Sequence, residues 1–127
     1  LKTFCNKYDK NYYKKFSKWC SEYFFLKHRN EERGIGGIFF DYLNAKSVKN
    51  FNFTVETGNF FCSFLRDMIK KNQYKVWNSK HREKLFNKRS RYVEFNLLYD
   101  KGTTFGLKTN GNVDAIFMSM PPLASWN

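Results

Sequence analysis

The sequence predicts an α+β fold in which an antiparallel β-sheet is flanked by α-helices. Two observations carry this prediction. Apolar residues recur with a helical period in most of the first two thirds of the 127-residue chain, and they alternate with a period of two in the last third. The hydrophobic fraction of 42% and the aromatic fraction of 20% are typical of a folding chain, and the length predicts at most a single domain over residues 1–127.

The N-terminal third predicts one helix followed by one strand. Residues 9–27 predict the helix, because their apolar side chains fall on a single helical stripe: Tyr12, Phe16, Trp19, Cys20, Tyr23 and Phe24. Gly34 disfavours continuation of a helix, and residues 35–43 then predict a strand. The charged segment 28–33 is therefore expected to lie in the connection between them.

The middle of the chain is expected to be helical. Residues 46–73 predict one or two helices, interrupted or weakened near Gly58, because glycine is a poor helix former. A short basic helix is expected over residues 78–90.

The C-terminal third predicts an antiparallel meander. Apolar and polar residues alternate over 92–100, which is typical of a strand. Asp100-Lys101-Gly102 predicts a turn, residues 104–108 a second strand, and Asn110-Gly111 a tight hairpin, since this dipeptide favours positive φ. A third strand is expected over 113–118, with Pro121-Pro122 ending it.

The charge balance restricts the partners without naming one. The net charge of +12 favours a polyanion: nucleic acid, acidic lipid or a small molecule with several carboxylates. Lysine is also favoured by AT-rich coding, which is an alternative reason for the excess. The basic stretch 80–91 lacks the aromatic platform of RNA-recognition modules, so no nucleic-acid partner is expected. No apolar run reaches the ~20 residues of a membrane span.

Familiar catalytic and metal motifs do not account for the remaining features. The segment 34-GIGG-37 fits no phosphate-binding pattern and precedes a strand, so its glycines are expected to let backbone or ligand approach closely. His28 and His81 have no cysteine or carboxylate at zinc-ligand spacing, and no nucleophile motif is present. Three cysteines without a CxxC pair favour reduced thiols and a cytoplasmic location: Cys5, Cys20 and Cys62.

Three stretches together resemble the oxygen-dependent coproporphyrinogen III oxidase family. They are 18-KWCSEYFFLKHRNEERGIGGIFFDYLN-44, 91-RYVEFNLLYDKGTTFGLKTNG-111 and 115-AIFMSMPPLASW-126. The resemblance implies part of a broad antiparallel sheet flanked by helices. It also implies a role in haem biosynthesis, where dioxygen, as co-substrate, converts two propionates of coproporphyrinogen III to vinyl groups and gives protoporphyrinogen IX.

The resemblance also assigns candidate site residues. Arg33 is expected either to bind a substrate propionate or to pair with a protein carboxylate and hold its loop. The substrate contact of the family falls on Asn110, Gly111 and Asn112, and the family commonly has arginine where Asn112 stands. His28 matches a histidine that binds a divalent metal in bacterial members, whereas other members need no metal.

The resemblance matches the C-terminal half of a longer protein. The proton-donating histidine and the Asn-x-Arg contact of the family lie in the other half, so no catalytic residue is assigned within this chain. The alternatives are part of an active enzyme, completed by an N-terminal half, and an inactive remnant or assembly module. The family's homodimer contact falls on residues 92–127. Self-association is therefore expected there, through exposed apolar residues of the meander: Leu98, Ile116 and Met118.

Overall fold

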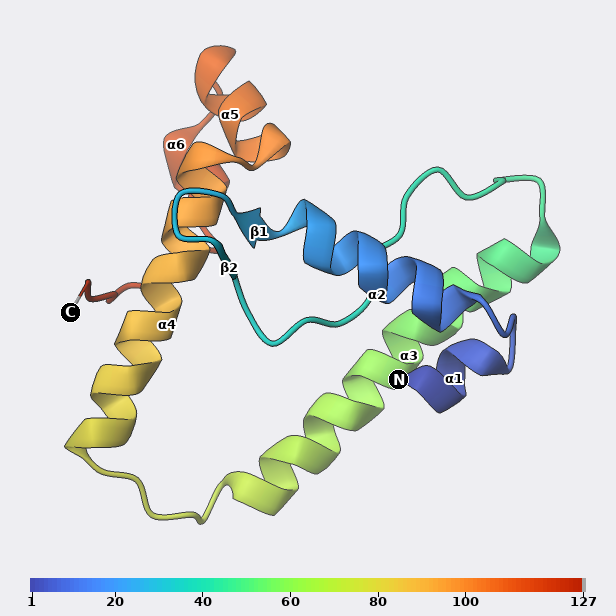
Figure 1. Ribbon diagram of the computed structural model, residues 1–127, viewed down its shortest axis with the longest axis horizontal. Coiled ribbons are helices and arrows are strands. Elements are labelled where there is room, and N and C mark those ends of the chain that lie inside the picture. Colours follow the sequence, from blue (N-terminus) through green and yellow to red (C-terminus); the bar gives the residue numbers. More distant parts are fainter. Residues whose placement is uncertain (127) are drawn as a thin grey trace. The chain divides into compact units, whose positions relative to one another are not determined.

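A computed structural model describes residues 1–126 of the chain (Figure 1). Helices dominate, and the β-structure within the described residues is one small antiparallel sheet. In chain order the elements are α1 (Lys2–Asn6), α2 (Tyr12–Tyr23), β1 (Phe25–Leu26), β2 (Glu31–Glu32), α3 (Val48–Asn72), α4 (Ser79–Leu98), α5 (Lys101–Lys108) and α6 (Val113–Ile116). The predicted mixture of helices with an antiparallel sheet is thus confirmed in outline, with far less sheet than expected.

The chain divides into two compact units. The first unit comprises residues 1–20 and 37–76, and the second comprises residues 21–36 and those from 77 onward. One boundary falls between Gly36 and Gly37, whose φ angles of +82° and +153° favour glycine over any residue with a side chain. A Cβ atom on either residue would meet no heavy atom within 4 Å. Backbone conformation, and not the expected close approach of another part of the chain, therefore requires glycine here.

Aromatic rings form the interior of the first unit. Phe53 of α3 is fully buried, and Cys5 and Phe16 complete the buried cluster. The ring of Phe53 packs against those of Phe4, Tyr8, Tyr12, Phe16 and Phe40, with centroid separations of 4.9–5.8 Å. Such ring pairs add about 0.5–1.5 kcal/mol each to the burial of apolar surface.

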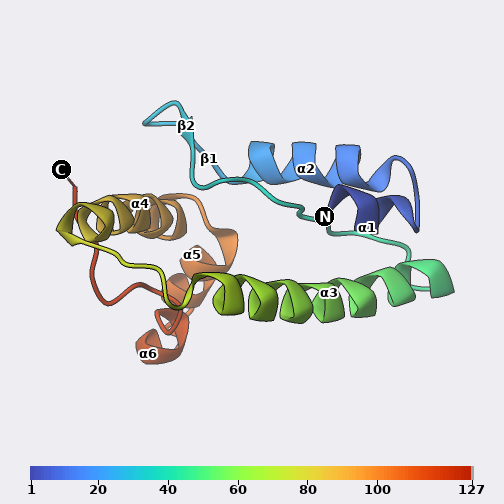
Figure 2. The same ribbon diagram turned by 90° about the horizontal axis from the view of Figure 1, so that it is seen from below.

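The long helix α3 runs through Gly58 without a break, as Figure 2 also shows. Ser47 caps its N-terminus by accepting a hydrogen bond from the amide of Asn50 at 3.4 Å. The Tyr12 hydroxyl donates to Asn50 Oδ1 at 2.6 Å and ties α2 to this end of α3. The prediction of helix over 46–73 is confirmed, and a single helix is formed because the tertiary contacts of Phe53 outweigh the weak propensity of one glycine.

Residues 35–43 do not form the predicted strand. The segment has no regular secondary structure, and Phe39 donates its amide to the Phe16 carbonyl of α2 at 3.1 Å. Ile38, Phe40 and Leu43 pack individually on the aromatic cluster, and Tyr42 has a φ of +51° that interrupts an extended chain. The apolar residues of segment 35–43 are thus explained by packing against helices and not by pairing with a neighbouring strand.

A hairpin and a helix form the centre of the second unit. β1 and β2 pair antiparallel, with Phe25 opposite Glu32 and Leu26 opposite Glu31. The turn between them, residues 27–30, contains Asn30 at a φ of +52°. Leu26 is fully buried and Phe95 of α4 nearly so, which places the hydrophobic contact of this unit between hairpin and helix.

The predicted C-terminal meander is wrong. α4 extends through the first expected strand to Leu98, and α5 and α6 occupy the positions of the other two. Asp100 does not make a hairpin turn; its carboxylate accepts the Thr103 amide at 2.7 Å and caps α5. The alternation over 92–100 also satisfies a helix, in which Phe95 faces the core and Leu98 remains exposed.

The Asn110-Gly111 dipeptide ends a helix and does not turn a hairpin. Asn110 has the expected positive φ of +55°. Its amide donates to the Leu107 carbonyl at 3.4 Å, and the Gly111 amide donates to the Gly106 carbonyl at 2.9 Å. This pair of bonds is a Schellman motif, in which Asn or Gly in the left-handed conformation satisfies the last carbonyls of a helix. The Asn110-Gly111 dipeptide therefore predicted the positive φ angle correctly, but the hairpin predicted from it is wrong.

Within residues 1–126, no helix combines the length and hydrophobicity that a membrane crossing requires.

Candidate functional site

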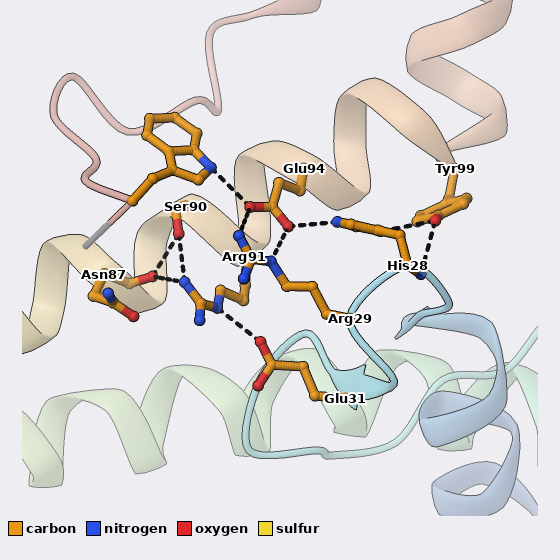
Figure 3. A network of polar contacts seen from close by, with 9 residues as sticks. His28, Arg29, Glu31, Asn87, Ser90, Arg91, Glu94 and Tyr99 are labelled. Carbon is orange, nitrogen blue, oxygen red and sulfur yellow. Dashed lines mark hydrogen bonds and ion pairs between the residues drawn. The ribbon is translucent and has the colours of Figure 1, made fainter.

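The polar centre of the second unit is the carboxylate of Glu94 in α4 (Figure 3). Its oxygen Oε2 accepts from Arg29 Nε at 2.6 Å and lies 2.8 Å from His28 Nε2. Its oxygen Oε1 accepts from Arg29 Nη2 at 2.7 Å and from Trp126 Nε1 at 2.7 Å. The carboxylate of Glu94 thus joins the hairpin turn, helix α4 and the C-terminal segment.

Arg29 and Glu94 form a two-bond fork, the geometry in which a guanidinium binds a carboxylate most strongly. The Glu94 side chain is 11% exposed, so solvent screens the pair only partly. These donors, Arg29 first and then His28 and Trp126, lower the pKa of Glu94 from 4.5 to about 2 against the opposing effect of burial. The same contact raises the pKa of Arg29. The carboxylate is therefore ionised throughout the neutral range.

The imidazole of His28 has a hydrogen-bond partner on each nitrogen. An ionised Glu94 only accepts, so Nε2 carries a proton. Nδ1 lies 2.8 Å from the Tyr99 hydroxyl, which also accepts the His28 backbone amide at 3.4 Å. Tyr99 is the C-cap residue of α4. Its hydroxyl therefore holds Nδ1 of His28 and fixes the orientation of the ring.

The predicted role of His28 as a metal ligand does not fit this arrangement. Both ring nitrogens are already engaged, and a metal ligand needs one with a free lone pair. No group of three or more metal-binding side chains occurs within residues 1–126. We therefore derive no metal-dependent step from this chain.

Arg33, predicted either to bind a propionate or to pair with a protein carboxylate, lies in an aromatic cage. Its guanidinium carbon is 4.1 Å from the ring centroid of Phe24 and 5.1 Å from those of Tyr92 and Phe95. Cation–π attraction holds the charge over the ring faces, and the N–H donors lie in the guanidinium plane. Such an arrangement fixes the cation in a half-buried place.

A second ion pair supports the hairpin from the other side of the turn. Arg91 Nε donates to Glu31 Oε1 at 2.8 Å, and Arg91 Nη1 donates to Ser90 Oγ at 3.0 Å. Ser90 is fully buried and donates its hydroxyl to the Asn87 carbonyl at 2.7 Å. Arg91 lowers the pKa of Glu31. Glu31 is thus held by Arg91.

The three predicted substrate contacts, Asn110, Gly111 and Asn112, end one helix and cap the next. Asn110 and Gly111 form the Schellman end of α5, and a Cβ on Gly111 would come within 3.0 Å of the Gly106 carbonyl oxygen. Asn112 caps α6, because its Oδ1 accepts from the amides of Asp114 and Ala115 at 2.9 and 3.3 Å. Asn110, Gly111 and Asn112 thus shape the connection between α5 and α6.

Sequence reasoning missed Glu94, Tyr99 and Trp126 as site residues. Glu94 and Tyr99 lay in a stretch interpreted as a strand, where their side chains would face opposite sides of the sheet. On a helix they are five residues apart and both reach the turn at His28. The usable signal was the one carboxylate within a strongly basic stretch, 88-KRSRYVEFN-96, which had to neutralise a nearby cation.

These features define an α+β chain with a carboxylate-centred polar site beside a caged arginine. The sequence model described as coproporphyrinogen III oxidase matches residues 1–127, and the chain therefore belongs to that family.

Curated relatives agree with this assignment. An oxygen-dependent coproporphyrinogen-III oxidase of Rickettsia bellii (strain OSU 85-389) is 50% identical over 127 residues, covering 99% of this chain and 46% of the relative. The protein of the same name from Rickettsia akari (strain Hartford) is 50% identical over 128 residues, with 100% and 46% coverage. The chain thus spans about half the length of the curated relatives it matches.

Proposed function

We propose that this chain is part of an oxygen-dependent coproporphyrinogen III oxidase. The complete enzyme decarboxylates two propionate groups of coproporphyrinogen III to vinyl groups, with dioxygen as the oxidant and protoporphyrinogen IX as the product. The observation that carries this proposal is the family match over the whole chain, supported by 50% identity to proteins named for that activity.

Within this proposal, Arg33 binds and orients a substrate propionate. Its cage of Phe24, Tyr92 and Phe95 holds the guanidinium over the ring faces and fixes its position, which supports this role. The fork of Arg29 is occupied by Glu94, at 2.6 and 2.7 Å. We infer that Arg29 holds the turn and that Arg33, four residues later, meets the substrate.

Asn110, Gly111 and Asn112 are proposed to contribute backbone contacts to the substrate. The side-chain oxygen of Asn112 caps α6, and its amide carries no charge, so it does not replace the arginine common in the family. Asn112 therefore supplies no charge for the recognition of a propionate.

A second candidate is a non-catalytic assembly module. The match covers 46% of the length of these relatives. Under either reading we propose self-association through residues 92–127 or pairing with a complementing N-terminal half. Exposed Leu98 and Met118 support such an interface. The cysteines form no disulfide, which supports a reducing, cytoplasmic setting: Cys5, Cys20 and Cys62.

A chimera tests the proposed function. The part of the Rickettsia bellii protein that this chain matches is replaced by residues 1–127, and protoporphyrin is measured by fluorescence after incubation with coproporphyrinogen III under air. We expect turnover by the chimera, and none by the 127-residue chain alone. Arg33→Gln should abolish most of the activity, while Arg66→Gln, an exposed position on α3, should leave it unchanged. A folded chimera without activity would support the assembly module instead.

A further inference from the structure

A groove on the N-terminal half of α4 has no role in the site above. It has a volume of about 560 Å³ and lies entirely within the second unit. This volume is within the range of small-molecule sites. Its lining combines apolar and cationic side chains: Trp77, His81, Arg82, Leu85, Phe86, Arg89 and Leu123.

The helical repeat places the groove residues together. Arg82, Phe86 and Arg89 stand at i, i+4 and i+7, which is one face of a helix. Trp77 precedes the N-cap residue of α4, and Leu123 comes from the C-terminal segment. The Ser125 amide donates to the Phe86 carbonyl at 3.2 Å and holds that segment against the helix. The groove is therefore built by three stretches of chain and is not a bare helix face.

Its two arginines are oriented by an aromatic ring and lack a carboxylate partner. The guanidinium carbons of Arg82 and Arg89 lie 5.3 and 5.9 Å from the centroid of Phe86. Among the described residues, neither Arg82 nor Arg89 forms an ion pair. The positive charge in the groove is thus uncompensated by the chain itself.

His81 adds a hydrogen-bond donor. Its Nδ1 accepts the Asn78 amide at 3.3 Å in the capping box of α4. The proton of the neutral ring is therefore on Nε2, where it is available as a donor. Histidine and the two guanidinium groups together present donors without any acidic lining residue.

We propose that this groove binds a carboxylate attached to a large apolar body. The cations recognise the carboxylate, and the apolar walls formed by Trp77, Leu85 and Phe86 cover the body. A simple phosphate or an inorganic anion would leave these walls in water. The mixed lining thus favours an amphipathic carboxylate.

Two sources supply this chemistry: a porphyrin with propionate chains and a long-chain fatty acid. The first rests on the proposed function, since coproporphyrinogen III carries four carboxylates on an apolar macrocycle, and it makes the groove a second contact beside Arg33. The second is independent of that function. Both share one recognition element, the pair Arg82 and Arg89.

Binding of two probes to the full 127-residue chain tests the proposal. Coproporphyrin III, the stable oxidised form, is titrated by fluorescence, and laurate by calorimetry. Arg82→Gln and Arg89→Gln are each expected to weaken binding about tenfold, the low end for a charged hydrogen bond at an open site. Trp77→Ala, a change at a 66%-exposed residue that leaves the core intact, should weaken it severalfold. Arg66→Gln provides the charge-matched control and should change affinity by less than about twofold.

Each outcome decides the proposal. Arginine-dependent binding of coproporphyrin III supports it with porphyrin as the ligand, and arginine-dependent binding of laurate alone supports it with a lipid. Binding of neither probe at millimolar concentration overturns it. Equal weakening by Arg66→Gln, or tighter binding of a single-stranded oligonucleotide, also overturns it, because the groove then acts as general positive charge. An inactive chimera with intact, arginine-dependent laurate binding would refute the proposed function alone.

Discussion

Different interactions stabilise the interior of each of the two units. In the first unit, Phe53 is buried among aromatic rings, and the ion pair of Lys49 with Asp9 is long and exposed, at 3.4 Å. In the second unit, Leu26 and Phe95 are buried, and beside them Glu94 joins a turn, a helix and the C-terminal segment through hydrogen bonds of 2.6–2.8 Å.

The first unit thus depends mainly on apolar packing, and the second on hydrogen bonds that position the side chains of the candidate site. Ring packing is tolerant of pH and salt, because it depends on apolar area. A carboxylate with several donors is sensitive to both, yet it fixes the turn that carries His28 and Arg29. The comparison predicts that core changes affect the first unit most and that charge changes affect the second.

The largest expected effect is that of Phe53→Ala. Removing this ring leaves a cavity within the aromatic cluster and should lower the free energy of unfolding by about 3–5 kcal/mol. Phe61→Ala, at a 61%-exposed position of the same helix, should cost less than about 1 kcal/mol. Urea unfolding followed by Trp19 fluorescence, after conservative replacement of Trp77 and Trp126, reports on the first unit. Equal effects of the two substitutions would contradict the aromatic core.

Glu94→Gln should destabilise the second unit by about 2 kcal/mol, because it removes the charged acceptor shared by Arg29, His28 and Trp126. Glu83→Gln, on the exposed part of the same helix, is the matched control with little expected change. A double-mutant cycle with Arg29→Gln should give a coupling energy of about 1–2 kcal/mol. A coupling near zero would mean that the fork does not hold the turn.

Acid should act on the second unit before the first. The pKa of Glu94 is lowered from 4.5 to about 2, so its contribution is complete above pH 4.5 and is lost as the pH falls towards 2. With allowance for solvent screening, the loss amounts to about 2 kcal/mol. Arg91 lowers the pKa of Glu31 and extends the effect. Amide exchange between pH 5 and 2.5 should show weakened protection at the hairpin and α4, and uniform loss in both units would refute the difference.

The smallest effect is expected for Arg33→Lys. An ammonium retains the charge but stacks less well on Phe24 than a planar guanidinium, so the free energy of unfolding should fall by about 1 kcal/mol or less. In the chimera the same change should raise KM for coproporphyrinogen III more than it lowers kcat, because lysine cannot form a forked contact with a propionate. A kcat loss without a KM change would assign Arg33 to the chemical step.

Helical periodicity was predictable, because the rings that build the first unit recur on one face of each helix. Tyr12 and Phe16 were placed on the correct stripe, and the helix over 46–73 was confirmed. The helices of the C-terminal third were not predicted. Alternation over nine residues fits a helix as well as a strand, and the helix caps Asp100 and Asn112 are residue types that also form turns. Side-chain acceptors at helix starts, rather than apolar spacing, decided the outcome.

The site was predictable in part. Motif resemblance indicated His28 and Arg33, which both lie in the second unit, but it gave no information on their partners. Glu94 stands 66 positions after His28, and Trp126 a further 32 residues on. Contacts of that separation depend on which faces pack, and this follows from the register of α4 on the hairpin and not from local sequence.

The pKa of Glu94 tests the central claim most directly, since every role assigned to the turn depends on an ionised carboxylate held by Arg29 and His28. Carbon-13 NMR of the Glu94 side-chain carboxyl, assigned by comparison with Glu94→Gln, measures it in the full chain. The account predicts a midpoint at about 2, moving towards 4.5 in Arg29→Gln. A midpoint near 4.5 in the unaltered chain would contradict it.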